Sequence, residues 1–272
     1  MSIYNHFNKV HYHTWGNRSH QAIILIHGID NNLCIWDEIA DGLAKYFYVV
    51  AIDIRGNGNS PWNSSAHYTE EDVYTDIRHV IDELLITSAV LVGHSLGGKL
   101  SLCFTARSPN IIEKLVLLDS SPVLSKSMQA VLLNYINEQP TSFSSIEDYV
   151  DYLTRTHAFS DRNKLEVFAS TNVKLSDGRY EKKSDPAFAL SMLSDDGFLL
   201  DSDVWRVMSE LACPVLIVRG KLSSITKYSE AERMLRSFRH ASLIEVGNAS
   251  HSIMLDQPKK VLDSILGFIM LS

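Results

Sequence analysis

The sequence has few of the features that mark disulfide-stapled or nucleic-acid-binding proteins. Its 272 residues include only three cysteines, Cys34, Cys103 and Cys213, scattered along the chain. An odd number of scattered cysteines argues against a disulfide framework and a CxxC zinc site, and fits a reducing cytoplasm. Lys and Arg number 25 against 32 Asp and Glu, a net charge of −7, so no nucleic-acid partner is expected.

Signals for membranes, leaders and bound groups are also missing. No run of about 18 apolar residues occurs, so no membrane partner is expected, and the opening MSIYNHFNKV has no apolar signal core, which predicts a cytoplasmic protein. No GxGxxG or P-loop follows the first strand-like run. His11, His13 and His20 are interpreted as surface residues, with a fortuitous metal patch as the alternative. We therefore expect no cofactor and no metal, and the oligomeric state stays open.

Short apolar runs alternate with amphipathic helical patterns along the chain. A segment beginning at Thr69-Glu-Glu-Asp72 resembles a capping box, and Pro258 precedes the last helical pattern. Strand-helix alternation of this kind predicts an α/β fold with a mostly parallel sheet covered by helices on both faces. The strand-like runs are 22–26, 48–52, 89–92, 115–118, 215–218 and 243–246.

The alternation breaks between about residues 121 and 213. This stretch has helix-like segments and polar turns such as Ser176-Asp-Gly178, but no strong strand-like run. We interpret it as a mainly helical insertion. The expected organisation is a core from 1–121, a helical cap from 122–205, and the remainder of the core from 206–272.

The run 89–92 leads directly into Gly93-His-Ser-Leu-Gly97. A G-x-S-x-G sequence between a strand and a helix is typical of a nucleophile elbow, in which small residues allow a sharp turn that exposes the serine hydroxyl. Ser95 is the predicted nucleophile, and the Leu96 N–H at the helix start is a predicted oxyanion donor. The alternative is a strand-to-helix turn that needs glycine only for packing.

A second donor is expected from the loop after the first parallel strand, His27-Gly28-Ile29-Asp30. The Ile29 N–H would donate, and Gly28 would let the chain approach. A plain strand-to-helix turn is the alternative. His27 is interpreted as structural, and Asp30 as a turn residue that could also contact substrate.

His251 is the predicted base because it follows the last strand-like run and precedes the final helix. Any single one of 11 histidines is weak evidence, so its position carries the prediction. With these motifs and the D-x-R-G-x-G-x-S loop at 53–60, the chain resembles the α/β-hydrolase superfamily over almost its whole length. That resemblance implies the α/β-hydrolase fold, a helical cap and a catalytic triad in the chain order Ser, acid, His.

The acid departs from the usual family pattern. No Asp or Glu occurs from 220 to 229, where many members carry it, and Ser223 and Ser224 stand there instead. Asp119 ends the strand after the nucleophile helix, and with Lys99 it resembles a branch of small cytoplasmic esterases. We therefore assign Asp119 as the acid, with a turn-capping role as the alternative. Asp53 is interpreted as a structural partner of Arg55.

Together these residues predict a serine carboxylic-ester hydrolase that acts on short or medium acyl esters through an acyl-enzyme. Its expected partner is a small-molecule acyl ester, with Gly28, His94 and unidentified cap residues in the binding site. Cap residues that could line an acyl pocket, or only pack the cap, are Leu132, Phe143, Tyr149, Leu153 and Phe159. The alternatives are an acyl thioesterase or acyl-carrier methyl-esterase, a C–C bond hydrolase, and a non-catalytic ligand-binding relative.

Overall fold

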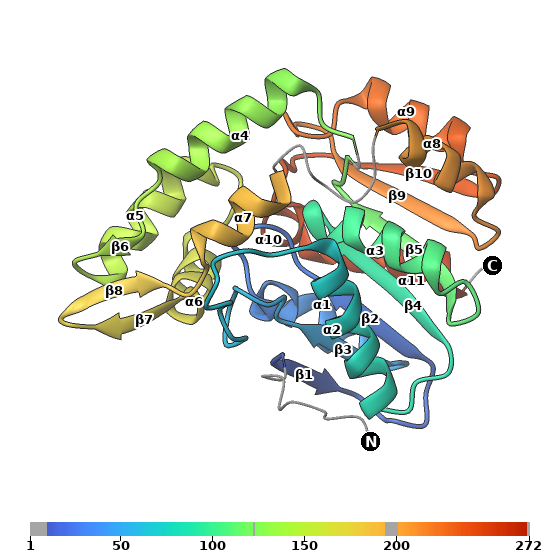
Figure 1. The fold of residues 1–272 in the computed structure, drawn as a ribbon, viewed down its shortest axis with the longest axis horizontal. Coiled ribbons are helices and arrows are strands. Elements are labelled where there is room, and N and C mark those ends of the chain that lie inside the picture. The colour runs from blue at the N-terminus through green and yellow to red at the C-terminus, as the bar shows by residue number, and fades with distance from the viewer. Residues whose placement is uncertain (1–9, 122, 194–200, 271–272) are drawn as a thin grey trace.

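A computed structural model describes residues 10–121, 123–193 and 201–270 of the chain. At its centre is a seven-stranded sheet in the order β1-β3-β2-β4-β5-β9-β10, in which β1 runs antiparallel to β3 and the remaining neighbours are parallel (Figure 1). The strands are β1 (Tyr12–Trp15), β2 (Ala22–Ile26), β3 (Tyr48–Ile52), β4 (Ala89–His94), β5 (Ile112–Leu118), β9 (Val215–Gly220) and β10 (Ala241–Val246).

The central strands are mostly apolar because both faces of the sheet are covered. Every residue of β2, β3, β4 and β9 is buried. The register pairs Ile26 with Gly93, and His94 with Leu118. The carboxyl ends of these parallel strands therefore lie at one edge of the sheet, where the loops that follow them meet.

Helices pack on both faces of the sheet, as the sequence predicts. Buried side chains of α2 (Glu70–Glu83), α3 (Leu96–Arg107), α8 (Asp201–Glu210) and α9 (Tyr228–Ser237) belong to one hydrophobic cluster. Those of α1 (Asp37–Leu43), α10 (Ile253–Asp256) and α11 (Pro258–Met270) belong to the other, which also includes η1 (Leu33–Trp36). The α/β fold class predicted from the sequence is confirmed.

Two helix starts predicted from the sequence are also confirmed. The Thr69 hydroxyl accepts the Asp72 N–H at 3.1 Å, and the Asp72 carboxylate accepts the Thr69 N–H at 2.9 Å, which completes a capping box. Helix α11 has Pro258 as its first residue, where the missing N–H of proline costs no helical hydrogen bond.

No helix within the described ranges is long and apolar enough to cross a bilayer.

The segment between β5 and β9 contains both helices and a small sheet. The helices are α4 (Lys126–Glu138), α5 (Ile146–Thr156), α6 (Arg162–Asn172) and α7 (Pro186–Leu193), followed by α8. The small sheet has the order β6-β8-β7, from Ser142–Phe143, Arg179–Lys182 and Val173–Ser176. We call residues 123–193 the cap, which lies to the left of the main sheet in Figure 1. The small sheet was not predicted from the sequence, because VKLS and RYEK are short, partly exposed strands without an apolar run.

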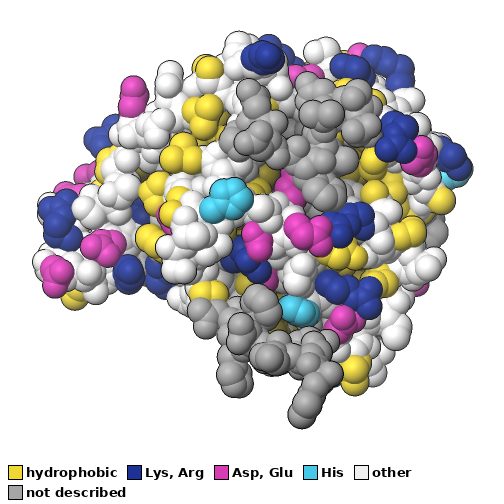
Figure 2. All heavy atoms as spheres, viewed as in Figure 1, with side chains coloured by type: hydrophobic (Ala, Val, Ile, Leu, Met, Phe, Trp, Pro, Cys, Tyr) yellow, Lys and Arg dark blue, Asp and Glu magenta, His cyan; other side chains and the backbone are white. Residues whose placement is uncertain are grey.

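The predicted turn at 176–178 closes the β7–β8 hairpin. Asp177 and Gly178 have φ values of 47° and 75°, which suits a two-residue hairpin turn. The boundary expected after residue 205 falls inside α8, whose Val204 and Met208 pack in the same cluster as α9. The division into core and cap at the expected boundaries stays a prediction. Across the face in Figure 2, Lys and Arg side chains lie among Asp and Glu side chains.

Candidate active site

Ser95 lies in a sharp turn between β4 and α3. Its backbone has φ 54° and ψ −123°, a conformation that L-residues rarely adopt. The Ser95 N–H donates to the Leu118 carbonyl at 3.0 Å, and the Ser120 hydroxyl donates to the Ser95 carbonyl at 2.8 Å. The turn also presses Gly97 against the end of β2, where an added Cβ would lie 2.3 Å from the His27 carbonyl oxygen. Only glycine fits there.

His251 reaches this serine from the loop between β10 and α10. Its Nε2 lies 2.9 Å from Ser95 Oγ, and its Nδ1 lies 2.6 Å from Asp119 Oδ2. The structure therefore brings Ser95, His251 and Asp119 into one hydrogen-bonded chain. His94 Nε2 donates to the main-chain carbonyl of His251 at 2.9 Å. The backbone of His251 is thus held by His94, and its ring by Asp119.

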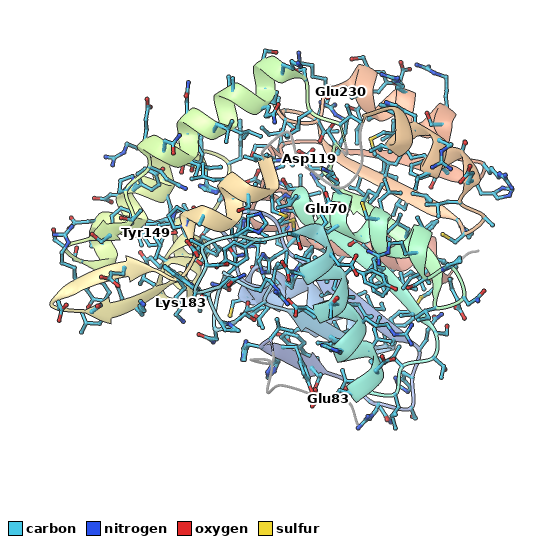
Figure 3. The ribbon with its side chains drawn as sticks, viewed as in Figure 1. Glu70, Glu83, Asp119, Tyr149, Lys183 and Glu230 are labelled. Carbon is cyan, nitrogen blue, oxygen red and sulfur yellow. The ribbon has the colours of Figure 1, made fainter. Side chains whose placement is uncertain are left out.

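Asp119 follows β5 directly and is fully buried. Its Oδ1 accepts the Gly220 N–H at 2.9 Å, and its Oδ2 accepts the Ser223 hydroxyl at 2.5 Å besides facing His251. The carboxylate is thus oriented by hydrogen bonds from two elements of the chain. Ser223 comes from the stretch in which no acid occurs. In Figure 3 Asp119 lies between the cap and the core helices.

The loop after β2 lies directly against the serine. A Cβ on Gly28 would be 3.0 Å from both Ser95 Cβ and His94 Nδ1, so glycine allows the approach. The N–H groups of Ile29 and Leu96 donate to no acceptor among the described residues. Their role as oxyanion donors stays a prediction. His27 is buried, with Nδ1 2.8 Å from the Gly28 carbonyl and Nε2 accepting the Ile54 N–H at 3.0 Å, which fits the structural interpretation.

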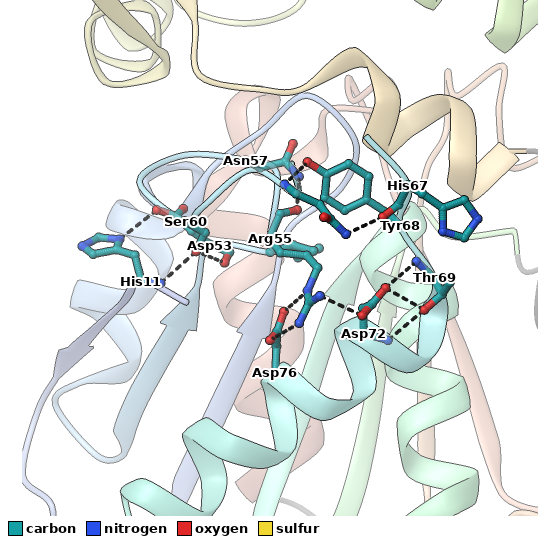
Figure 4. Close-up of polar contacts among 12 residues, drawn as sticks. His11, Asp53, Arg55, Asn57, Ser60, His67, Tyr68, Thr69, Asp72 and Asp76 are labelled. Atoms are coloured by element: carbon teal, nitrogen blue, oxygen red, sulfur yellow. Dashed lines mark hydrogen bonds and ion pairs between the residues drawn. The ribbon is translucent and has the colours of Figure 1, made fainter. Parts of the chain in front are cut away.

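Asp53 follows β3 and does not contact His251. The prediction that it pairs with Arg55 was wrong. Asp53 accepts hydrogen bonds from the backbone of Leu33 at 2.7 Å and Asn59 at 2.9 Å, and contacts His11 Nδ1 at 2.8 Å. Arg55 instead binds α2, because Asp72 and Asp76 lie one turn apart on the same face. Figure 4 shows both clusters, with Arg55 Nε 2.5 Å from Asp76 Oδ2.

A cavity of about 150 Å³ opens beside Ser95. Three of the cap residues predicted for a pocket line it: Leu132, Tyr149 and Leu153. The other two do not, since Phe143 stacks behind Tyr149 with ring centroids 4.4 Å apart and Phe159 is 48% exposed. Lining residues that the sequence did not single out are Tyr135, Ile136, Tyr152, His157 and Phe168 from the cap, with Asn31, Ile225 and Ser252 from the core.

Burial sets the protonation of several cavity residues. Desolvation lowers the pKa of His94 well below its usual value and lowers the pKa of His157, so both imidazoles are neutral at pH 7. It also raises the pKa of the Tyr149 phenol. These three side chains therefore present neutral hydrogen-bonding groups to the cavity.

Burial also affects two cysteines that do not line the cavity. Burial raises the pKa of Cys34 to about 11 and that of Cys103 to about 12, so both thiols stay protonated at neutral pH. Over the described ranges, no group of three or more His, Cys, Asp or Glu side chains is placed to hold a metal ion.

Comparison with known proteins places this geometry among related folds. Residues 21–258 match the family described as alpha/beta hydrolase fold. A 2-(acetamidomethylene)succinate hydrolase of Mesorhizobium japonicum is 25% identical over 91% of this chain and 87% of its own. The crystal structure of an E-2-(acetamidomethylene)succinate hydrolase superposes with a TM-score of 0.85 at 24% identity, covering 96% of this chain and 95% of the other. An esterase of Mycobacterium tuberculosis is 26% identical over 94% of this chain and 84% of its own.

Replacement by alanine should change the free energy of unfolding in opposite directions at Gly97 and at Gly267. Gly97→Ala should lower the free energy of unfolding by about 1–3 kcal/mol, because the new methyl group collides with the backbone of β2. Gly267→Ala, in α11 with open space around it, should raise that free energy by about 0.5–1 kcal/mol through helix propensity. Urea unfolding of both variants measures the difference. Equal effects at the two positions would contradict the described packing of the turn.

Proposed function

The chain belongs to the alpha/beta hydrolase fold family, and from this premise we propose that it is a serine carboxylic-ester hydrolase that acts on short or medium acyl esters. The proposal rests chiefly on one observation. Ser95 Oγ, the two ring nitrogens of His251 and Asp119 Oδ2 form a continuous hydrogen-bonded chain with distances of 2.9 and 2.6 Å. A nucleophile, a base and an orienting carboxylate in this order are the groups that acyl transfer requires.

In the first half of the reaction, His251 Nε2 takes the proton of Ser95 as Oγ attacks the acyl carbonyl carbon. The imidazolium that forms is stabilised by Asp119, which lies against Nδ1. The developing negative charge on the carbonyl oxygen is held by the N–H groups of Ile29 and Leu96. The tetrahedral intermediate collapses as His251 returns its proton to the leaving alcohol, and the acyl-enzyme remains on Ser95.

In the second half, a water molecule takes the place of the alcohol. His251 accepts a proton from that water, which attacks the acyl carbon, and Ser95 leaves with the proton restored to its oxygen. The chain's own residues supply every group in both halves, so the proposed reaction requires no cofactor. A neutral His94 beside His251 adds no competing positive charge to the site.

Substrate size follows from the cavity. A volume of about 150 Å³ bounded by apolar cap residues and tyrosines accommodates a short acyl group rather than a long lipid chain. We propose soluble short or medium acyl esters as substrates, in preference to emulsified triglyceride. An acyl thioester would form the same acyl-enzyme, so the leaving group has to be determined by experiment.

A panel of p-nitrophenyl esters and acyl thioesters of graded chain length tests the proposal. We expect hydrolysis to be fastest with short acyl groups, and Ser95→Ala to abolish it while the circular dichroism spectrum is kept. A fluorophosphonate should label the protein once, on Ser95. No turnover of any ester, or labelling at another serine, would overturn the assignment. A preference for thioesters would favour the thioesterase alternative.

Asp119→Asn should lower kcat by about 10⁴-fold, by analogy with triads whose acid is amidated, because an amide favours the wrong imidazole tautomer. KM and the unfolding temperature should change little, since the side chains have nearly the same shape. Steady-state kinetics with a p-nitrophenyl ester measures the effect. Ser224→Ala, at an exposed position of the same loop as Ser223, is the control.

Ser223→Ala removes one hydrogen bond to the Asp119 carboxylate but leaves the Gly220 N–H and His251 in place. Its loss of kcat should be mild beside that of Asp119→Asn. Near-full activity of Asp119→Asn would show that another carboxylate orients His251.

A further inference from the structure

Asp30 follows the proposed oxyanion donor Ile29 and is held entirely by the cap. Its Oδ2 forms an ion pair with Lys182, and its Oδ1 accepts the hydroxyl of Ser184. Its main-chain carbonyl accepts the side-chain amide of Asn172 at 3.2 Å. The backbone of Asp30 has φ 60°, a left-handed conformation that costs energy in most residues and persists when surrounding contacts hold it.

The side chains that bind the Asp30 carboxylate lie outside the lining of the catalytic cavity. Ile29 and Asp30 line the catalytic cavity, whereas neither Lys182 nor Ser184 is found among the described residues that line it. Lys182 instead donates to Gln139 Oε1 at 3.0 Å, besides its ion pair with Asp30. Any effect of Lys182 on the reaction therefore has to pass through the loop.

Burial gives the ion pair between Lys182 and Asp30 a high desolvation cost. The Lys182 side chain is 4% exposed and that of Asp30 is 20% exposed. Removing two charges from water costs about as much free energy as their attraction returns, so a buried ion pair contributes little net stability. It does define a geometry, because each buried charge needs its partner and has no alternative position. The pair fixes where the carboxylate of Asp30 lies relative to the β8 strand.

We propose that Lys182 and Ser184 are positioning residues for the oxyanion hole. By clamping both carboxylate oxygens of Asp30, they set the orientation of the adjoining peptide units and hold the Ile29 N–H toward the reacting carbonyl oxygen. Asn172 supports the same loop through the Asp30 carbonyl and also donates to the Tyr149 hydroxyl at 2.9 Å. Docking of the cap thus completes the hole. This inference rests on the proposed function, which assigns the Ile29 N–H as a donor.

Lys182→Met tests the clamp, because methionine keeps much of the side-chain length and removes the charge. We expect kcat for p-nitrophenyl butyrate to fall by about 10–100-fold, with KM changed by less than about threefold. This loss is smaller than the roughly 10²–10³-fold cost of removing an oxyanion donor, because here the donor is displaced and not removed. The inhibition constant of butylboronic acid, whose tetrahedral adduct on serine places an oxygen in the hole, should rise by a similar factor. A merely structural role would not move kcat and the boronate constant together.

Lys164→Met is the matched control. Lys164 of α6 pairs with Glu38 of α1 at 2.8 Å, so it also joins cap to core, but away from the oxyanion loop. Its kcat and boronate constant should stay within about twofold of the wild-type values, as for a surface ion pair of small net energy. An equal fall in both variants would overturn the proposal and leave only general loosening of the cap.

Ser184→Ala keeps the test decisive should Lys182→Met fail to fold. It removes a single hydrogen bond to Asp30 and leaves the ion pair, so we expect a fall in kcat of about three- to tenfold with KM preserved, in line with one hydrogen bond of about 1 kcal/mol. Unchanged kcat in folded Ser184→Ala would overturn the clamp, whether or not Lys182→Met folds. Absence of ester hydrolysis in the wild type would instead overturn the proposed function.

Discussion

The backbone turn at Ser95 is the constraint on which the rest of the site depends. A serine at φ 54° carries a conformational cost of about 1–3 kcal/mol, which neighbouring contacts have to offset. The hydrogen bond from Ser95 to the last residue of β5, the hydrogen bond from Ser120 just after that strand, and the close packing of Gly97 on β2 provide those contacts. Because β2, β4, β5 and β9 are parallel, the segments that follow them converge on this turn. That convergence brings Asp119 and the loop after β2, which contains Ile29, close to Ser95.

The carboxylate of the proposed triad and the serine that hydrogen-bonds to it come from two neighbouring strands of the sheet. Asp119 directly follows β5 and Ser223 follows the neighbouring strand β9, and Ser223 Oγ lies 2.5 Å from Asp119 Oδ2. In the proposed triad the acid comes after β5, and the serine after β9 donates a hydrogen bond to it. The cap completes the site from above, by lining the cavity and by holding Asp30.

The sequence was sufficient for features that are local or periodic. Apolar runs identified the six parallel strands, most clearly β2 and β3, in which every residue is apolar and buried because both faces of the sheet are covered. The G-x-S-x-G turn and the position of His251 after the last strand predicted residues that lie together. Long-range pairings were not predictable: Arg55 binds Asp76 rather than Asp53, and Lys182 meets Asp30 across more than half of the chain. The β7–β8 hairpin was missed since its exposed strands carry no apolar pattern.

The most direct test of the account is to trap the covalent intermediate. The protein is mixed with p-nitrophenyl acetate, quenched in acid within the first turnover, digested and examined by mass spectrometry. The account predicts an acetyl group on the peptide that contains Ser95, present in the wild type and accumulating to a lesser extent in Asp119→Asn. Turnover of the ester without any acyl adduct, or with the adduct on a different residue, would contradict it.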